Sequence, residues 1–233
     1  MCGIAGFIGK GSEVDIQKMT SSLSHRGPDA SGFFERSNVR FGHRRLTIQE
    51  TVLGQQPMRD RSGLTVVFNG EIYNYPELRK ELEGKGYVFR EGHSDTEVLL
   101  HGYRAWGENL TLKLNGMWAF AIYDEQASKV FLSRDRFGQK PLFYTQQNGT
   151  FAFGSEVRAL QAHSNLKFDL SRLGVKKYLA HVHMPYESTL YTQVSKLPAG
   201  HSMVVNTKDL SYKISQYWRY SLVPDESKSE KYW

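Results

Sequence analysis

The chain begins Met1-Cys2-Gly3-Ile4-Ala5-Gly6-Phe7-Ile8-Gly9, which places its single cysteine directly before an apolar run. The run is short and interrupted by glycine, a pattern that favours a buried strand. A buried strand at this point would anchor the residue that precedes it. We therefore expect the fold to hold Cys2 in a fixed position.

Cys2 also has unusual chemistry for a cysteine. A small residue after the initiator methionine permits removal of Met1, which would leave a thiol and a free α-amine on one residue. The amine has a reference pKa of about 7.7–8.0 and the thiol one of about 8.5, so the amine can act as base and then as acid. Elsewhere in a chain, a lone cysteine is more often a small buried apolar residue.

Composition describes an ordinary globular protein. Hydrophobic residues make up 39% and aromatic residues 13% of the 233 residues, and one cysteine allows no internal disulfide. The net charge of +6 comes from scattered basic residues, which argues against nucleic-acid binding. No leader and no apolar run of about 20 residues is evident, so we expect a cytoplasmic protein without a membrane segment.

Residue patterns predict strands with helices interspersed, an α+β protein. Alternating or apolar runs predict strands at 4–9, 39–43, 64–69, 117–123, 130–132, 142–144 and 151–153. Capping and proline signals predict helices that begin at Ser12, near Pro76 and at Ser94. After residue 160 the pattern changes to a helix at 171–180, short strands at 203–205 and 212–218, and a charged tail at 224–233.

A cysteine nucleophile needs an oxyanion hole from elsewhere in the chain. Asn69-Gly70, at the end of a predicted strand, is a candidate because an Asn amide and a Gly N–H can point at one oxygen. The dipeptide alone more commonly forms a hairpin turn. Its context has to decide between the two.

Several motifs in order resemble the class II glutamine amidotransferases. They are Met1-Cys2-Gly3-Ile4, His25-Arg26-Gly27-Pro28-Asp29, His43-Arg44-Arg45-Leu46, Phe68-Asn69-Gly70-Glu71-Ile72-Tyr73-Asn74 and Ser94-Asp95-Thr96-Glu97. Four later stretches resemble the asparagine synthetase branch of that family: Gly116-Met117-Trp118-Ala119-Phe120-Ala121, Ser133-Arg134-Asp135-Arg136-Phe137-Gly138 with Lys140-Pro141-Leu142, Phe153-Gly154-Ser155-Glu156, and Lys196-Leu197-Pro198-Ala199-Gly200-His201. The likeness extends over about residues 1–220.

This resemblance implies a four-layer αββα sandwich of the N-terminal-nucleophile hydrolase type that hydrolyses L-glutamine to glutamate and ammonia. It assigns Cys2 as nucleophile, and the Asn69 side chain with the Gly70 N–H as oxyanion hole. It also implies substrate-binding residues, with Arg45 on the carboxylate and two acids on the ammonium: Arg45, Leu46, Ile48, Asn69, Gly70, Glu71 and Asp95. No metal or organic cofactor is expected in this chain.

Each role has a plainer alternative. Arg44 could replace Arg45, and Glu71 and Asp95 could be a turn acid and a helix cap. Two residues of the first loop motif, Arg26 and Asp29, are expected to brace the loop over Cys2. The two motif histidines, His25 and His43, are expected to be structural, since the amine base leaves an imidazole no obvious task.

One segment of the asparagine synthetase branch is missing. Its ATP-pyrophosphatase domain carries a Ser-Gly-Gly-x-Asp-Ser phosphate loop, and this sequence contains none. We therefore expect a glutaminase domain at 1–160 and an extension at 161–233 that leads towards an absent synthetase domain, with ATP and Mg needed only there. The chain is then a piece of a longer synthetase, which we favour, or a free-standing subunit that passes ammonia to a partner.

Other functions stay open at this stage. One is an N-terminal-nucleophile hydrolase of a different amide, and another is a non-catalytic scaffold that keeps Met1. Aspartate is the commonest acceptor of the ammonia in the branch, but the sequence does not fix it. A homo-oligomer is an open alternative to a monomer.

Overall fold

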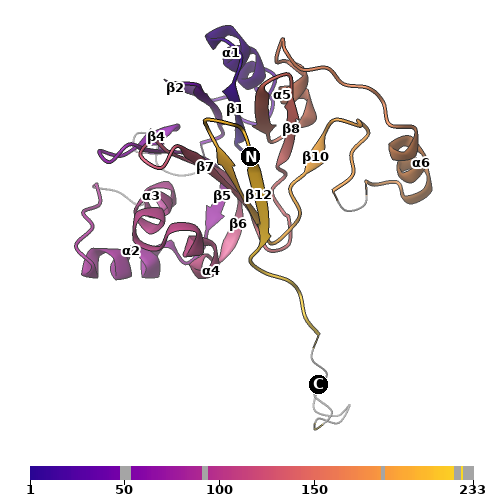
Figure 1. The fold of residues 1–233 in the computed structure, drawn as a ribbon. Coiled ribbons are helices and arrows are strands. Elements are labelled where there is room, and N and C mark those ends of the chain that lie inside the picture. Colours follow the sequence, from indigo (N-terminus) through magenta and orange to yellow (C-terminus); the bar gives the residue numbers. More distant parts are fainter. Residues whose placement is uncertain (48–53, 91–93, 185–186, 223–226, 228–233) are drawn as a thin grey trace.

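Two six-stranded antiparallel sheets dominate the computed structural model, which describes residues 1–47, 54–90, 94–184, 187–222 and 227 (Figure 1). Sheet A has the strand order β10-β8-β9-β1-β3-β2. Its strands are β1 (Gly3–Gly9), β2 (Ala30–Arg36), β3 (Val39–Arg45), β8 (Phe143–Gln147), β9 (Thr150–Gly154) and β10 (Ser195–Lys196).

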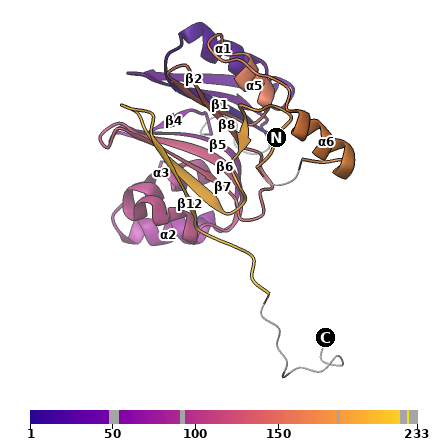
Figure 2. The ribbon, with the colours of Figure 1, turned by 45° about the vertical axis from the view of Figure 1, so that its right-hand side comes forward.

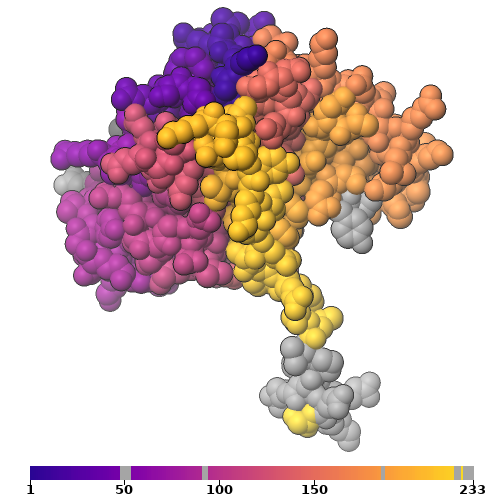
Figure 3. All heavy atoms as spheres, viewed as in Figure 1, coloured from indigo at the N-terminus to yellow at the C-terminus, as the bar shows by residue number. Residues whose placement is uncertain are grey.

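Sheet B has the order β12-β11-β7-β6-β5-β4. Its strands are β4 (Met58–Arg59), β5 (Leu64–Ile72), β6 (Gly116–Asp124), β7 (Lys129–Arg134), β11 (His201–Asn206) and β12 (Tyr212–Gln216). At the outer edge of this sheet β12 is exposed on the surface, and the chain after it leaves the body of the molecule (Figure 3).

Helices cover the outer faces of both sheets, as two views of the ribbon show (Figures 1 and 2). Helices α1 (Glu13–Ser21) and α5 (Val157–Gln161) lie on sheet A. Sheet B is covered by α2 (Tyr75–Gly84), α3 (Asp95–Trp106), the 3₁₀ turn η1 (Gly107–Asn109) and α4 (Leu110–Lys113). Helix α6 (Arg172–His181) lies to one side of these layers.

Three apolar cores separate the layers. The middle core joins the facing sides of the sheets, with Ile4 and Phe41 from sheet A against Val67 and Leu132 from sheet B. The outer cores pack sheet A on α1 and α5, and sheet B on α2, α3 and α4. The layers are therefore helix, sheet, sheet and helix, and the predicted four-layer α+β sandwich is confirmed.

Strand β1 lies inside sheet A, with β3 on one side and β9 on the other. Its side chains alternate, so that Ile4 and Ile8 enter the middle core while Ala5 and Phe7 face α1. Gly6 faces the middle core, where a Cβ would lie 2.5 Å from the ring of Phe153. The apolar opening of the sequence is thus a central strand, as predicted.

Most predicted elements are confirmed within one or two residues at their ends. Helix α1 has the predicted capping box, in which the Ser12 N–H donates to the Asp15 carboxylate at 2.8 Å. The strand expected at 64–69 continues to Ile72, so the prediction that Asn69-Gly70 ends a strand is wrong. Strand β2 and helix α5 were not predicted from the sequence.

Residues after 160 contribute strands to both sheets. Strand β10 pairs with β8 in sheet A, and β11 pairs with β7 in sheet B. The division of the chain at residue 160 stays a prediction about function, since in packing β10, β11 and β12 extend the sheets that the earlier strands form. Of the predicted tail at 224–233, only Ser227 lies within the described residues.

Candidate active site

A cavity of about 160 Å³ lies where the beginning of β1, the end of β3 and the second half of β5 come together. It brings together all the predicted site residues that the structure describes: Cys2, Arg45, Leu46, Asn69, Gly70, Glu71 and Asp95. The remaining predicted residue, Ile48, lies outside the described part of the chain. The other lining residues are Met1, Gly54, Gln56, Phe68, Tyr75, Ser94, Thr96, Met117 and Lys140.

Strand pairing explains why Cys2 and Arg45 meet. Strands β1 and β3 run antiparallel with Gly3 opposite Arg44, so the beginning of β1 lies beside the end of β3. The Cys2 Sγ lies 3.8 Å from the carbonyl oxygen of Leu46. Residues more than forty positions apart in the chain therefore become neighbours through one strand pair.

The backbone of Cys2 is held by a chain of polar contacts. Nε of Arg26 donates to the Cys2 carbonyl at 3.0 Å, and its Nη1 donates to Glu156 at 3.0 Å. His25 and Arg158 also contact the Glu156 carboxylate, at 3.0 and 3.2 Å. Partial burial raises the pKa of Glu156, but the interactions with His25 and Arg26 outweigh it and hold the pKa below its usual value. The contacts agree with the bracing role expected for Arg26 and the structural role expected for His25.

The side chain of Asn69 is a buried donor that finds no acceptor in the described part of the chain. Its side chain is 1% exposed, and Nδ2 makes no hydrogen bond among the described residues. Buried polar atoms are nearly always hydrogen-bonded in native structures, so an exception in a cavity calls for a functional reason. Asn69 lies opposite Ala119 within the β5–β6 pair, which excludes the hairpin alternative.

Gly70 is required by the backbone that faces it. A Cβ here would lie 2.1 Å from the carbonyl oxygen of Met117 on β6. No side chain fits at that distance, so the strands pack closely and the wall of the cavity at this point is bare backbone.

Of the two adjacent arginines, Arg45 reaches the cavity. Its side chain is buried and lines the wall, whereas Arg44 is not among the lining residues described. Neighbouring His43 is 1% exposed, and burial lowers its pKa to about 4, with the charge of Arg45 acting in the same direction. His43 is therefore neutral at neutral pH, in keeping with a structural role beside Arg45.

Two carboxylates, Glu71 and Asp95, share the opposite part of the cavity. Burial raises the pKa of Asp95 to about 6, and the charge of Glu71 adds to the rise. The backbone N–H of Ile72 donates to the Asp95 carboxylate at 3.1 Å and partly offsets it. Because Ser94 is the N-cap of α3, the alternative that Asp95 is the helix cap is wrong. The two carboxylates therefore lie close enough for the charge of Glu71 to oppose the ionisation of Asp95.

Gln56, Tyr75, Met117 and Lys140 are among the lining residues that sequence reasoning did not assign to the site. Gln56 Oε1 accepts a hydrogen bond from the Phe68 N–H at 2.6 Å, which links its loop to β5. Lys140 is 7% exposed, and its Nζ lies 3.4 Å from Met1 Sδ. Lys140 belongs to a recognised motif, but nothing in that motif indicated its proximity to Cys2.

Comparison with known proteins identifies the family of this fold and site. A family model described as a glutamine amidotransferase domain matches residues 1–218. The chain belongs to that family. This confirms the resemblance noted in the sequence, and the match includes the strands after residue 160.

Curated relatives include glutamine-hydrolysing asparagine synthetases. "Asparagine synthetase [glutamine-hydrolyzing] 3" of Bacillus subtilis is 36% identical over an alignment of 241 positions, which covers 100% of this chain and 38% of that protein. "Putative asparagine synthetase [glutamine-hydrolyzing] 2" of Methanocaldococcus jannaschii is 33% identical, over 98% of this chain and 49% of that protein. The chain thus spans less than half the length of these relatives.

Solved structures share the fold. A glutamine phosphoribosylpyrophosphate amidotransferase from B. subtilis superposes with a TM-score of 0.66 at 21% identity, over 93% of this chain and 49% of that one. The structure titled as the allosteric regulatory enzyme of purine biosynthesis gives a TM-score of 0.69 at 20% identity, with the same coverage of 93% and 49%. At this identity the likeness concerns the fold.

Two further structural findings concern the described residues alone. No group of three or more His, Cys, Asp or Glu side chains among them is arranged to hold a metal ion. None of the helices they form has the length and apolar character needed to cross a membrane.

Proposed function

We propose that this chain hydrolyses the side-chain amide of L-glutamine, with Cys2 as the nucleophile. The observation that carries the proposal is the buried Asn69 amide, which finds no hydrogen-bond acceptor among the described residues and lines the same cavity as Cys2. A preorganised donor of this kind is what a tetrahedral oxyanion needs. The Gly70 N–H, on bare backbone beside it, is the second donor.

The charged groups of the cavity match the two ends of an amino acid. Arg45 binds the α-carboxylate, since a guanidinium suits a carboxylate with two parallel hydrogen bonds. Glu71 and Asp95 bind the α-ammonium, which relieves the repulsion between the two acids. Leu46 and Ile48 contact the remainder of the substrate.

Removal of Met1 prepares the nucleophile. It frees the α-amine of Cys2, which takes the thiol proton, and the thiolate attacks the side-chain carbonyl carbon of glutamine. Asn69 and Gly70 stabilise the oxyanion. The amine then returns its proton to the leaving nitrogen, the C–N bond breaks, and ammonia leaves a thioester on Cys2.

Water completes the cycle. The α-amine accepts a proton from the water that attacks the thioester, the C–S bond breaks, and glutamate leaves as the thiolate is reprotonated. Every proton transfer uses the amine of the nucleophile itself. Glutamine hydrolysis by this route therefore requires no metal or organic cofactor.

The ammonia passes to an ATP-dependent synthetase domain or subunit, most simply one that converts aspartate to asparagine. The names of the curated relatives support this acceptor, as does the length of those proteins beyond the matched part. ATP and Mg²⁺ belong to that second reaction. The cytoplasm is the compartment that we propose for it.

Intact-mass spectrometry before and after incubation with a diazo-ketone analogue of glutamine tests the first reaction. We expect loss of Met1 and a single adduct, which Cys2→Ala abolishes. A retained Met1, or a free Cys2 that stays unmodified, would instead favour a non-catalytic scaffold.

Substrate choice needs a separate test. Arg45→Ala and Asp95→Ala should lose activity towards glutamine, because each removes a contact to a charged end of the amino acid. Activity towards glutamine that survives both changes would point to a hydrolase of some other amide.

A further inference from the structure

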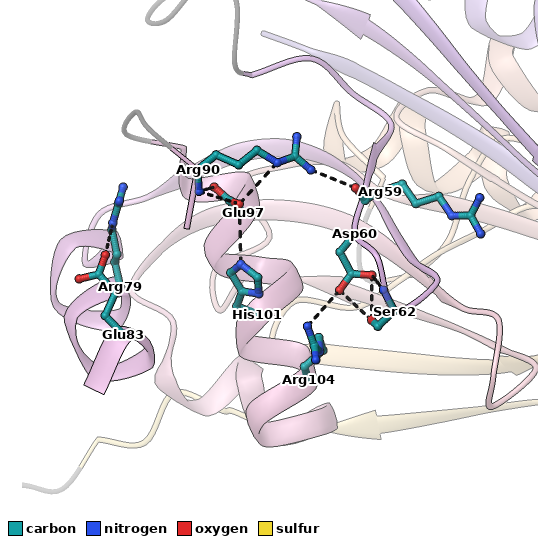
Figure 4. A network of polar contacts seen from close by, with 9 residues as sticks. All are labelled: Arg59, Asp60, Ser62, Arg79, Glu83, Arg90, Glu97, His101 and Arg104. Atoms are coloured by element: carbon teal, nitrogen blue, oxygen red, sulfur yellow. Dashed lines mark hydrogen bonds and ion pairs between the residues drawn. The ribbon is translucent and has the colours of Figure 1, made fainter. Parts of the chain in front are cut away.

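A second and larger cavity lies on the outer side of sheet B, beside α3. Its volume is about 580 Å³, and it shares no lining residue with the Cys2 cavity. Three segments form it: the β4–β5 connection, residues 85–90 after α2, and one side of α3. Figure 4 shows the polar contacts of this region.

The two acids of this cavity are already engaged. Asp60 accepts hydrogen bonds from the N–H groups of Ser62 and Leu64 at 2.9 and 3.0 Å, and lies 3.7 Å from Arg104. Glu97 accepts from the backbone N–H of Arg90 at 3.2 Å (Figure 4). Their side chains are only 9% and 10% exposed, so they form the floor of the cavity rather than its open part.

The basic side chains of the cavity outnumber its acids. Arg61, Lys85, Arg90 and Arg104 all line it, against Asp60 and Glu97. Arg61 and Lys85 are exposed, and neither has a carboxylate within 4.0 Å in the described part of the chain. The rim of the cavity is therefore positively charged, and Arg61 and Lys85 can donate hydrogen bonds to an anion.

His101 is a second and independent sign of a ligand. It is 7% exposed, lines the cavity, and neither ring nitrogen makes a hydrogen bond among the residues described. Its Nε2 approaches Glu97 only to 3.7 Å, and the edge of its ring packs on Phe89 at 4.6 Å between centroids. Nε2 faces the Glu97 carboxylate, but Nδ1 of this buried imidazole has no partner among the residues described and is available to a ligand.

We propose that this cavity binds a phosphate-bearing small molecule. Its volume lies in the range of about 300–1,000 Å³ that is usual for small-molecule sites. Arg61 and Lys85 would contact the phosphate oxygens, since charge-assisted hydrogen bonds to arginine and lysine are the common means of phosphate recognition. His101 would donate from the inner wall.

Calorimetric titration of the full chain with inorganic pyrophosphate and with ADP tests the site. Saturable binding of both would indicate that the phosphate groups alone are recognised, and binding of ADP only would indicate a nucleotide. Arg61→Gln/Lys85→Gln should weaken either interaction by about tenfold or more, as expected for loss of hydrogen bonds between charged groups. His101→Phe should weaken it as well while keeping a ring against Phe89.

Lys208→Gln/Lys213→Gln is the matched control. Both lysines are exposed, and the double change also removes two positive charges, but at the β12 edge of sheet B, opposite the β4 edge. The control should bind like the unaltered chain. No binding of either probe, wild-type affinity in both cavity variants, or an equal loss in the control would overturn the proposal.

Discussion

Replacing Asn69 by alanine measures how much the Nδ2 donor contributes to the proposed reaction. Asn69 Nδ2 makes no hydrogen bond in the described part of the free protein, so its removal breaks no hydrogen bond there. We therefore expect Asn69→Ala to change the free energy of unfolding by about 1 kcal/mol or less. Asn69→Ala should instead destabilise the transition state, in which the oxyanion would have accepted a hydrogen bond from Nδ2.

The expected size of that destabilisation follows from the role. Removing one oxyanion-hole donor costs about 2.7–4 kcal/mol, which is about 10²- to 10³-fold in kcat. KM for glutamine should change little, because the ground-state carbonyl does not occupy the oxyanion position. Steady-state release of glutamate, with glutamine varied, separates the two constants.

Thr65→Val is the control for this experiment. Thr65 also lies on β5, is fully buried, and has a hydroxyl without a partner among the described residues, but it does not line the cavity. Its kcat should equal that of the unaltered chain. An Asn69→Ala enzyme with normal kcat, or one whose loss of activity follows a matching loss of stability, would refute the oxyanion role.

Three further predictions concern the cavity and the contacts that support it. Because the pKa of Asp95 is raised to about 6, KM for glutamine should rise as pH falls below about 6, and Asp95→Asn should lack this rise. Between about pH 4 and 6 the native wild type holds a proton on Asp95 that the unfolded chain has released, so its free energy of unfolding falls as pH rises. The difference in unfolding free energy in favour of Asp95→Asn should therefore grow over that range. Glu156→Gln should weaken the hold on Arg26 and lower kcat several-fold with KM little changed. Glu125→Gln, at another carboxylate that contacts two arginines, should leave kcat unchanged. Equal effects of the two changes would contradict the role of Glu156 in positioning Arg26. Gly70→Ala should lower the free energy of unfolding by about 1–3 kcal/mol, seen as a lower midpoint in urea, because its Cβ meets a β6 carbonyl at 2.1 Å; an unshifted midpoint would contradict the packing described.

Local pattern alone predicted the central strands and the capped helices. Strands β1, β6 and β9 are apolar because both of their faces are covered, and such runs are conspicuous in a sequence. Strand β2 escaped prediction because most of it is exposed at the edge of sheet A, where no apolar alternation is needed. The four-layer arrangement came from the family resemblance and not from periodicity.

The site was predictable only where a motif marked it. Asn69-Gly70 taken alone favours a hairpin, and its place inside β5 became clear from the β5–β6 pairing. The motif favoured Arg45 over Arg44, but which of the two side chains lines the cavity is set by the path of β3, which no local pattern encodes. Gln56 and Lys140 reach the cavity through loops whose course no local pattern encodes.

The cavity beside α3 could not be predicted from the sequence either, because it also forms where separate segments of the chain meet. Its basic residues come from three segments and never form a dense run, so their charges appear as scattered surface residues in the sequence. His101 appears in the sequence as one more residue of an amphipathic helix. Only the fold shows that these residues face one volume.

The position of β1 has a consequence for synthesis on the ribosome. Its partner β3 follows within forty residues, but its other partner, β9, begins only at Thr150. Because chain closure must precede such distant pairing, the first strand to be translated is among the last to be enclosed. We therefore expect the amino terminus to stay accessible to methionine aminopeptidase until β9 has been translated, and the Cys2 thiol to take its place in the cavity only after β9 has left the exit tunnel.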